Sequence, residues 1–132
     1  MRVLIVEDDF GSRRYLQVLF RGRTDVDVVV DGVEAVEAFR LAWEDQIPYS
    51  LILLDIMMPN KDGHEALGEI RDIEASMCVH HNDRVRVVMT TALEDPRNVV
   101  DAYYKGGADA YLVKPIDREK LFETIRGLGL EI

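Results

Sequence analysis

The run Leu51-Ile52-Leu53-Leu54, followed directly by Asp55, decides the fold. An apolar run without polar alternation is typical of a strand that is covered on both faces, as in a parallel sheet. Further strands of this mostly uninterrupted apolar kind are expected at Arg2–Val6, Val26–Val30, Val85–Met89 and Ala110–Val113. A five-stranded parallel sheet is therefore predicted.

Amphipathic stretches lie between these strands. Ala35, Phe39 and Ala42 recur at the i, i+4, i+7 spacing of a helix with one buried face. Helices are expected over residues 10–21, 32–44, 63–76, 96–105 and 118–128, with capping aspartates at Asp9, Asp31, Asp62, Asp95 and Asp117. The alternation implies right-handed crossovers, so the predicted fold class is α/β, a doubly wound (βα)5 parallel sheet between two helical layers. The least patterned connection, Ser76–Arg84, is expected to be a surface loop.

The length, charge and cysteine content of the chain indicate its domain number, its partners and its compartment. A chain of 132 residues with 48% hydrophobic content matches a single domain, expected to span residues 1–132. Its 16 basic and 25 acidic residues give a net charge of −9, which repels nucleic acid phosphates and anionic membranes, so neither is expected as a direct partner. Cys78 is the only cysteine, which excludes a disulfide within the chain and favours the reducing cytoplasm.

Reactive side chains follow the expected strands. In strand order they are Glu7 and Asp8, Asp55, the pair Thr90 and Thr91, and Lys114. In a parallel α/β sheet these carboxyl ends form the ligand-binding edge. Carboxylates gathered there repel one another unless a cation compensates, and an oxygen-only ligand set suits Mg²⁺, with Mn²⁺ as the alternative. A carboxylate beside such an ion and a lysine can attack phosphorus, so formation of an aspartyl phosphate is predicted.

Four segments resemble the motif set of bacterial response-regulator receiver domains, the CheY-like family. They are Val3–Asp9, Leu53–Gly63, Thr90–Ala92 and Tyr111–Pro115, in the family's order and spacing. The resemblance extends from Arg2 to about Leu128 and implies a flavodoxin-like sheet with strand order 2-1-3-4-5. It implies a two-component signalling protein that accepts a phosphoryl group from the phosphohistidine of a sensor histidine kinase or phosphotransfer protein. Such a domain is not a separate enzyme, since it catalyses only its own phosphorylation and dephosphorylation.

The resemblance assigns roles at the sheet edge. Asp55 would be the phosphoacceptor. Glu7 and Asp8 would hold Mg²⁺ together with Asp55 and the backbone carbonyl of Met57. Lys114 would contact the phosphoryl group, and its bond to the following proline is expected to be cis, as in the family.

The resemblance also predicts how the signal leaves the domain. Thr91, which precedes an alanine as the family's hydroxyl residue does, would bind the phosphate and switch together with the aromatic Tyr111. The output surface would be the face of the fourth helix, fifth strand and fifth helix, which would bind a downstream protein or a second copy in a phosphorylation-linked homodimer. Met57 and Leu93 are apolar at positions that tune the lifetime of the phosphoryl group, which predicts slow self-dephosphorylation.

Two other function classes stay open. A small Mg²⁺-dependent phosphatase or hydrolase would use the same acids but would need a second acid and a lid, and neither is evident. A flavodoxin-like cofactor carrier would need a loop rich in Ser, Thr and Gly where the acids Glu7–Asp9 stand. Cys78, His80 and His81 lack the spacing of a zinc site and are expected to belong to a polar loop. The sequence leaves open whether the chain is a stand-alone regulator or part of a longer protein.

Overall fold

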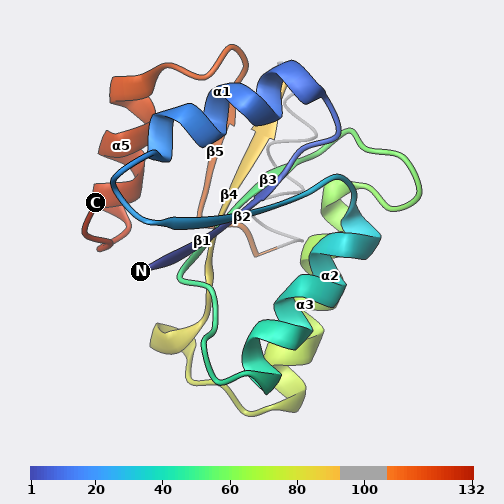
Figure 1. Cartoon of the computed structure of the whole chain (residues 1–132). Helices are drawn as coiled ribbons and strands as arrows, with labels where there is room; N and C mark the ends of the chain where they lie inside the picture. The colour runs from blue at the N-terminus through green and yellow to red at the C-terminus, as the bar shows by residue number, and fades with distance from the viewer. Residues whose placement is uncertain (93–106) are drawn as a thin grey trace.

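A parallel sheet forms the middle layer of the molecule (Figure 1). The computed structural model describes residues 1–92 and 107–132 of the chain. The strands are β1 (Arg2–Val6), β2 (Asp25–Val29), β3 (Leu51–Asp55), β4 (Arg86–Thr91) and β5 (Ala110–Val113). They pair in parallel in the order β2-β1-β3-β4-β5, which confirms the predicted sheet and its strand order.

Helices cover both faces of the sheet (Figure 1). One face carries α1 (Phe10–Phe20) and α5 (Arg118–Gly127), and the other carries α2 (Gly32–Glu44) and α3 (Gly63–Ser76). Each of these helices begins at a predicted aspartate cap, whose side chain accepts a hydrogen bond from the N–H three residues later; the caps are Asp9, Asp31, Asp62 and Asp117. The helix expected over residues 96–105 and its cap Asp95 lie outside the described residues.

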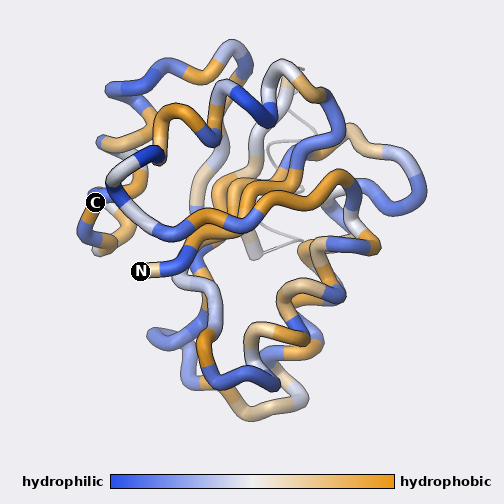
Figure 2. The backbone as a smooth tube through the Cα atoms, in the orientation of Figure 1, coloured by the Kyte–Doolittle hydropathy of each residue, from blue (hydrophilic) through white to orange (hydrophobic). Residues whose placement is uncertain are grey.

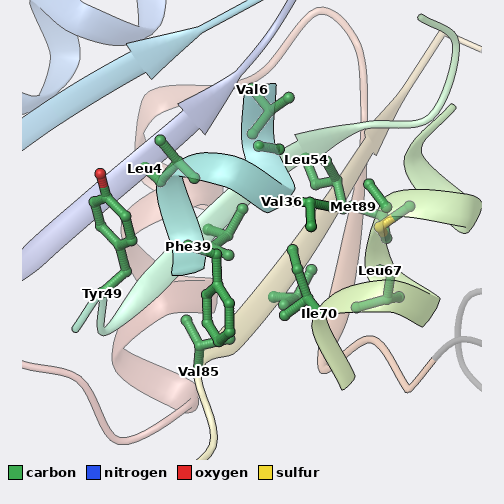
Figure 3. Packing of buried hydrophobic residues seen from close by; sticks show 14 of the residues in the cluster. Leu4, Val6, Val36, Phe39, Tyr49, Leu54, Leu67, Ile70, Val85 and Met89 are labelled. Atoms are coloured by element: carbon green, nitrogen blue, oxygen red, sulfur yellow. The ribbon is translucent and has the colours of Figure 1, made fainter. Parts of the chain in front are cut away.

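The apolar run Leu51–Leu54, which predicted the fold, contributes side chains to two hydrophobic cores. Along β3, Ile52 and Leu54 pack with α2 and α3, while Leu51 and Leu53 pack with α1 and α5. All four side chains are at most 1% exposed. The first core is shown in Figure 3, and Figure 2 shows the hydrophobic colour concentrated on the central strands. The strand lacks polar alternation because both of its faces are covered.

Strand ends differ from the prediction by one or two residues. The expected strand Val26–Val30 is found at Asp25–Val29, and Val85–Met89 is found at Arg86–Thr91. The fourth strand is longer at its carboxyl end because Thr90 pairs with Asp55 and Thr91 pairs with Val113 in the parallel ladder. Backbone pairing therefore sets these ends, although the added residues are polar.

Of the connection expected at Ser76–Arg84, Ser76 is the last residue of α3, and the rest is a loop, as expected, with one short 3-10 turn at His81–Asp83. Within residues 1–92 and 107–132, no helix has the length and apolar character that a membrane crossing requires.

A buried ion-pair network lies at the end of the sheet where β4 begins. The Glu74 carboxylate, 1% exposed, accepts hydrogen bonds from Nη1 of Arg71 at 2.7 Å and from the backbone N–H of Val85 at 2.8 Å. Nε of Arg84 lies 3.6 Å from the same carboxylate. Arg71 also donates to Asp109 at 3.1 Å. The network joins the end of α3 to the starts of β4 and β5.

Candidate functional site

Three carboxylates converge at the carboxyl edge of the sheet. Glu7 and Asp8 follow β1, and Asp55 is the last residue of β3, the neighbouring strand. One ligand oxygen from each lies within 4.8 Å of the others, and this is the one such group of potential metal ligands in the described part of the chain. Glu7 is 1% exposed and Asp55 is 4% exposed, whereas Asp8 faces solvent. The sheet thus brings the predicted acids together at its ligand-binding edge.

Lys114, directly after β5, reaches the same cluster. Its Nζ donates a hydrogen bond to Oε2 of Glu7 at 2.6 Å and lies 3.4 Å from Oδ2 of Asp55. Burial disfavours the ammonium, but the hydrogen bond to Glu7 and the charge of Asp55 raise the pKa of Lys114 above its usual value. The bond from Lys114 to Pro115 is cis, as expected. A cation is therefore held between the two buried acids.

The environment of Asp55 opposes its ionisation. Burial, followed by the neighbouring Glu7 carboxylate, raises the pKa of Asp55 to about 7, although Lys114 pulls in the other direction. The cluster places three carboxyl groups beside one ammonium group. A further cation at this position would relieve the repulsion.

The donor set fits a hard divalent ion. Three carboxylates with oxygen atoms this close, one of them open to solvent, match the preference of Mg²⁺ for a few carboxylates plus water. Neither nitrogen nor sulfur ligands are part of the group. The side chain of Met57, two residues after Asp55, is 60% exposed. Ligation of a metal by the backbone carbonyl of Met57 stays a prediction.

The two expected switch residues lie on β4 and β5. Thr91 ends β4, is 1% exposed, and accepts a hydrogen bond on its backbone carbonyl from the N–H of Lys114 at 2.7 Å. Tyr111, in β5, is half-buried and packs against the core that α2 and α3 cover. Thr91 is thus tied by its backbone to the site lysine. Leu93, the other expected lifetime residue, lies outside the described residues.

The Cys78, His80 and His81 segment forms no metal-ligand group in the part of the chain that the structure describes. His80 instead accepts a hydrogen bond on Nδ1 from the backbone N–H of Asn82 at 3.2 Å. The segment is the polar loop that its spacing indicated.

The loop after Asp55 makes contacts that sequence reasoning missed. The N–H of Gly63 donates to the carbonyl of Ile56 at 2.9 Å and closes the loop at its base. A Cβ at Gly63 would lie 2.4 Å from the carbonyl oxygen of Asp55, so this position has no room for a side chain. The Asp62-Gly63 pair was a usable signal for a helix start, but it did not indicate contact with the end of β3 at Asp55.

Similarity to known proteins extends over nearly the whole chain. The family model described as "Response regulator receiver domain" matches residues 3–126. The chain is 35% identical over 129 residues to the regulatory protein VanRB of Enterococcus faecalis, covering 97% of this chain and 52% of that protein. It is 30% identical to the chemotaxis protein CheY of Listeria monocytogenes, covering 95% of each.

The relatives differ in length. The chain spans about half of VanRB and of the response regulator ArlR of Staphylococcus saprophyticus. It spans 7% of the hybrid signal transduction histidine kinase I of Dictyostelium discoideum, at 30% identity over 94% of this chain. The shared part is thus found alone in some proteins and joined to other segments in others.

Solved structures agree with the fold. The chain is similar to the CheX-CheY-BeF3-Mg complex from Borrelia burgdorferi, with a TM-score of 0.83 and 28% identity, covering 99% of this chain and 90% of that one. The receiver domain of the histidine kinase CKI1 from Arabidopsis thaliana, complexed with Mg²⁺ and BeF3⁻, gives a TM-score of 0.80 and 26% identity, covering 97% and 89%.

Proposed function

The chain belongs to the response regulator receiver domain family, and on this basis we propose that Asp55 is the residue on which it accepts a phosphoryl group. Receiver domains are signalling phosphoacceptors. The observation that carries the residue assignment is the convergence of buried Asp55 with Glu7, Asp8 and Lys114 at one sheet edge.

The proposed phosphoryl transfer forms one bond to phosphorus and breaks another. A carboxylate oxygen of Asp55 forms a bond to phosphorus while the bond from phosphorus to the histidine nitrogen of the partner breaks, and the freed imidazole takes up a proton. Glu7, Asp8, Asp55 and the backbone carbonyl of Met57 would hold Mg²⁺, which is the ligand set that the family resemblance implies. When bound, the ion would neutralise charge on the phosphoryl oxygens. Lys114 would leave Glu7 and pair with the phosphoryl group, which places a mobile ammonium where charge accumulates.

Output would follow from Thr91 and Tyr111. Thr91 would donate its hydroxyl to the new phosphate, and Tyr111, half-buried beside the core, would move inward with it. The carboxyl end of β4 is well placed to respond because the carbonyl of Thr91 is bonded to Lys114. The changed surface would include β5 and α5 and would bind the downstream partner or a second copy of the chain.

The phosphodonor would be a histidine kinase or phosphotransfer protein. Beside Lys114 lies an open hollow of about 540 Å³, lined on the α1 side by Ser12, Tyr15 and Leu16. It would admit a histidine side chain from a partner. The single cysteine supports the cytoplasm as the location.

The comparisons favour this function over a hydrolase, because the matched relatives are response regulators, chemotaxis proteins and histidine kinases. The same matches favour it over a flavin carrier. We propose that the domain catalyses only its own phosphorylation and dephosphorylation.

Acetyl phosphate with Mg²⁺ is expected to add one phosphoryl group per chain, measured by intact mass. Asp55→Ala and addition of a chelator should each abolish the adduct, because the first removes the nucleophile and the second removes the ion that neutralises the phosphoryl oxygens. Asp72→Ala, an exposed aspartate on α3, is the matched control and should be phosphorylated like the wild type. An adduct that persists in Asp55→Ala would contradict the assignment.

Binding of Mg²⁺ is expected to weaken about tenfold between pH 8 and pH 6. Without metal the pKa of Asp55 is about 7, so below this pH the ion must displace a proton, and above it the carboxylate is already free. Titration calorimetry at both pH values measures the affinity, and two buffers of different ionisation enthalpy measure the released proton. Asp55→Asn should lose this pH dependence; an equal dependence in wild type and variant would refute the explanation.

A further inference from the structure

The tip of the loop between β3 and α3 is tied to the start of α2. Both oxygens of the Asp31 carboxylate are used: Oδ1 accepts from the N–H of Glu34 at 2.9 Å and caps α2, and Oδ2 accepts from Nδ2 of Asn60 at 2.9 Å. Asp31 is 8% exposed. These hydrogen bonds, the cap first, hold the pKa of Asp31 below its usual value, so the carboxylate stays ionised at neutral pH. The buried Asp31 carboxylate thus binds both the start of α2 and the loop between β3 and α3.

A backbone contact lies beside this side-chain contact. The N–H of Gly32 donates to the carbonyl of Lys61 at 3.2 Å. A Cβ at Gly32 would lie 2.4 Å from that carbonyl oxygen, so only glycine allows this approach. Asn60 has a φ of 68°, a left-handed conformation that asparagine tolerates better than most residues. The loop therefore makes its turn where it meets α2.

Between its base and its tip the loop has one further anchor, Met58, which is partly buried against the core that α2 and α3 cover. Met57, Pro59 and Asn60 are exposed, and the ion pair from Lys61 to Glu69 anchors the side of the loop nearer α3. The contacts to Asp31 and Gly32 are therefore expected to restrict the stretch that leads from Asp55 through Met57 to the tip.

We propose that Asp31, Gly32 and Asn60 are positioning residues for Mg²⁺ binding, because they hold the loop that presents the Met57 carbonyl to the acidic cluster. The inference rests on the proposed function, in which this carbonyl is a metal ligand. None of the three residues belongs to the cluster of carboxylates. Mg²⁺ requires near-ideal octahedral geometry, so a ligand on a loop that samples several conformations binds less well. The apparent affinity falls in proportion to the fraction of molecules in the competent conformation.

The test is the affinity of the unphosphorylated domain for Mg²⁺, measured by titration calorimetry. Asn60→Gly removes the amide but keeps the left-handed conformation accessible, and Asp31→Ser keeps a capping oxygen but shortens the side chain. Both are expected to weaken Mg²⁺ binding about three- to tenfold. Gly32→Ala should weaken it as well, because its Cβ would push the Lys61 carbonyl away.

A control and a rescue separate positioning from general damage. Asp117→Ser makes the same change at the cap of α5, where Asp117 accepts from the N–H of Lys120 at 2.9 Å, and should leave Mg²⁺ affinity unchanged. The double variant Asp31→Asn with Asn60→Asp reverses donor and acceptor. It should bind Mg²⁺ within about twofold of the wild type, whereas Asn60→Asp alone places two carboxylates together and should bind weakly. Circular dichroism checks that each variant is folded.

The outcomes are distinct. Wild-type affinity in folded Asn60→Gly and Asp31→Ser, or failure of the double variant to recover, overturns the positioning role and leaves the phosphoacceptor assignment intact. Absence of Mg²⁺ binding by the wild type overturns the proposed function and this inference with it.

Discussion

Asp55→Asn is expected to raise the free energy of unfolding of the metal-free domain by about 2 to 4 kcal/mol at pH 8. Folding raises the pKa of this carboxyl from 3.8 to about 7, so the folded domain holds the proton more tightly than the unfolded chain does. The wild type therefore loses stability as the pH rises from about 4 to 7, and above 7 it carries the full cost of the buried charge. Asparagine is neutral at every pH and removes this cost.

The difference in the free energy of unfolding between the wild type and Asp55→Asn should shrink as the pH falls. At pH 5 it should fall to less than half of its value at pH 8, and below about pH 3 it should vanish, because the carboxyl is then protonated in both the folded domain and the unfolded chain. Urea unfolding in chelator at these pH values measures it. Asp72→Asn, at an exposed position on α3, should change the free energy of unfolding by less than about 0.5 kcal/mol. A pH-independent gain in Asp55→Asn would show that charge is not its cause.

Glu74→Ala is expected to lower the free energy of unfolding by about 3 to 5 kcal/mol. The carboxylate is 1% exposed, and its loss leaves the Arg71 guanidinium without one ion-pair partner and the N–H of Val85 without its acceptor. A buried charge or donor that loses its partner bears the full cost of its desolvation. Urea unfolding at neutral pH measures the loss.

Glu69→Ala on the same helix is the matched comparison. The Glu69 side chain is 46% exposed and pairs with Lys61 at the surface, so its removal should cost less than about 1 kcal/mol. If Glu69→Ala and Glu74→Ala lowered the free energy of unfolding equally, burial of the Glu74 carboxylate would not explain the effect of its removal.

Strands and helix starts could be predicted because their signals are local. The apolar run at Leu51–Leu54 requires cover on both faces, and an aspartate before each helix satisfies free N–H groups. The acids after β1 and β3 could be placed together because parallel strands end at one edge. These rules need no knowledge of which side chains touch.

Contacts between distant segments could not be predicted in this way. Asp31 and Asn60 lie 29 residues apart, and each looks like an ordinary turn residue. Glu74 looks like any helix carboxylate, yet packing of α3 against the start of β4 buries it. The position of Lys114 at the acidic edge could be predicted, but its direct ion pair with Glu7, 107 positions away, could not. Such pairs form only once the complete fold brings the segments together.

The alternation of β3 between two cores has a consequence for the insertion or loss of a single residue. Leu51 and Leu53 belong to one core and Ile52 and Leu54 to the other, so a shift by one position would send every side chain of the strand to the wrong layer. Neighbouring strands on both sides fix the same register. The strand therefore allows variation in residue identity but not in length. Its register fixes the position of Asp55 at the carboxyl edge of the sheet relative to the two cores.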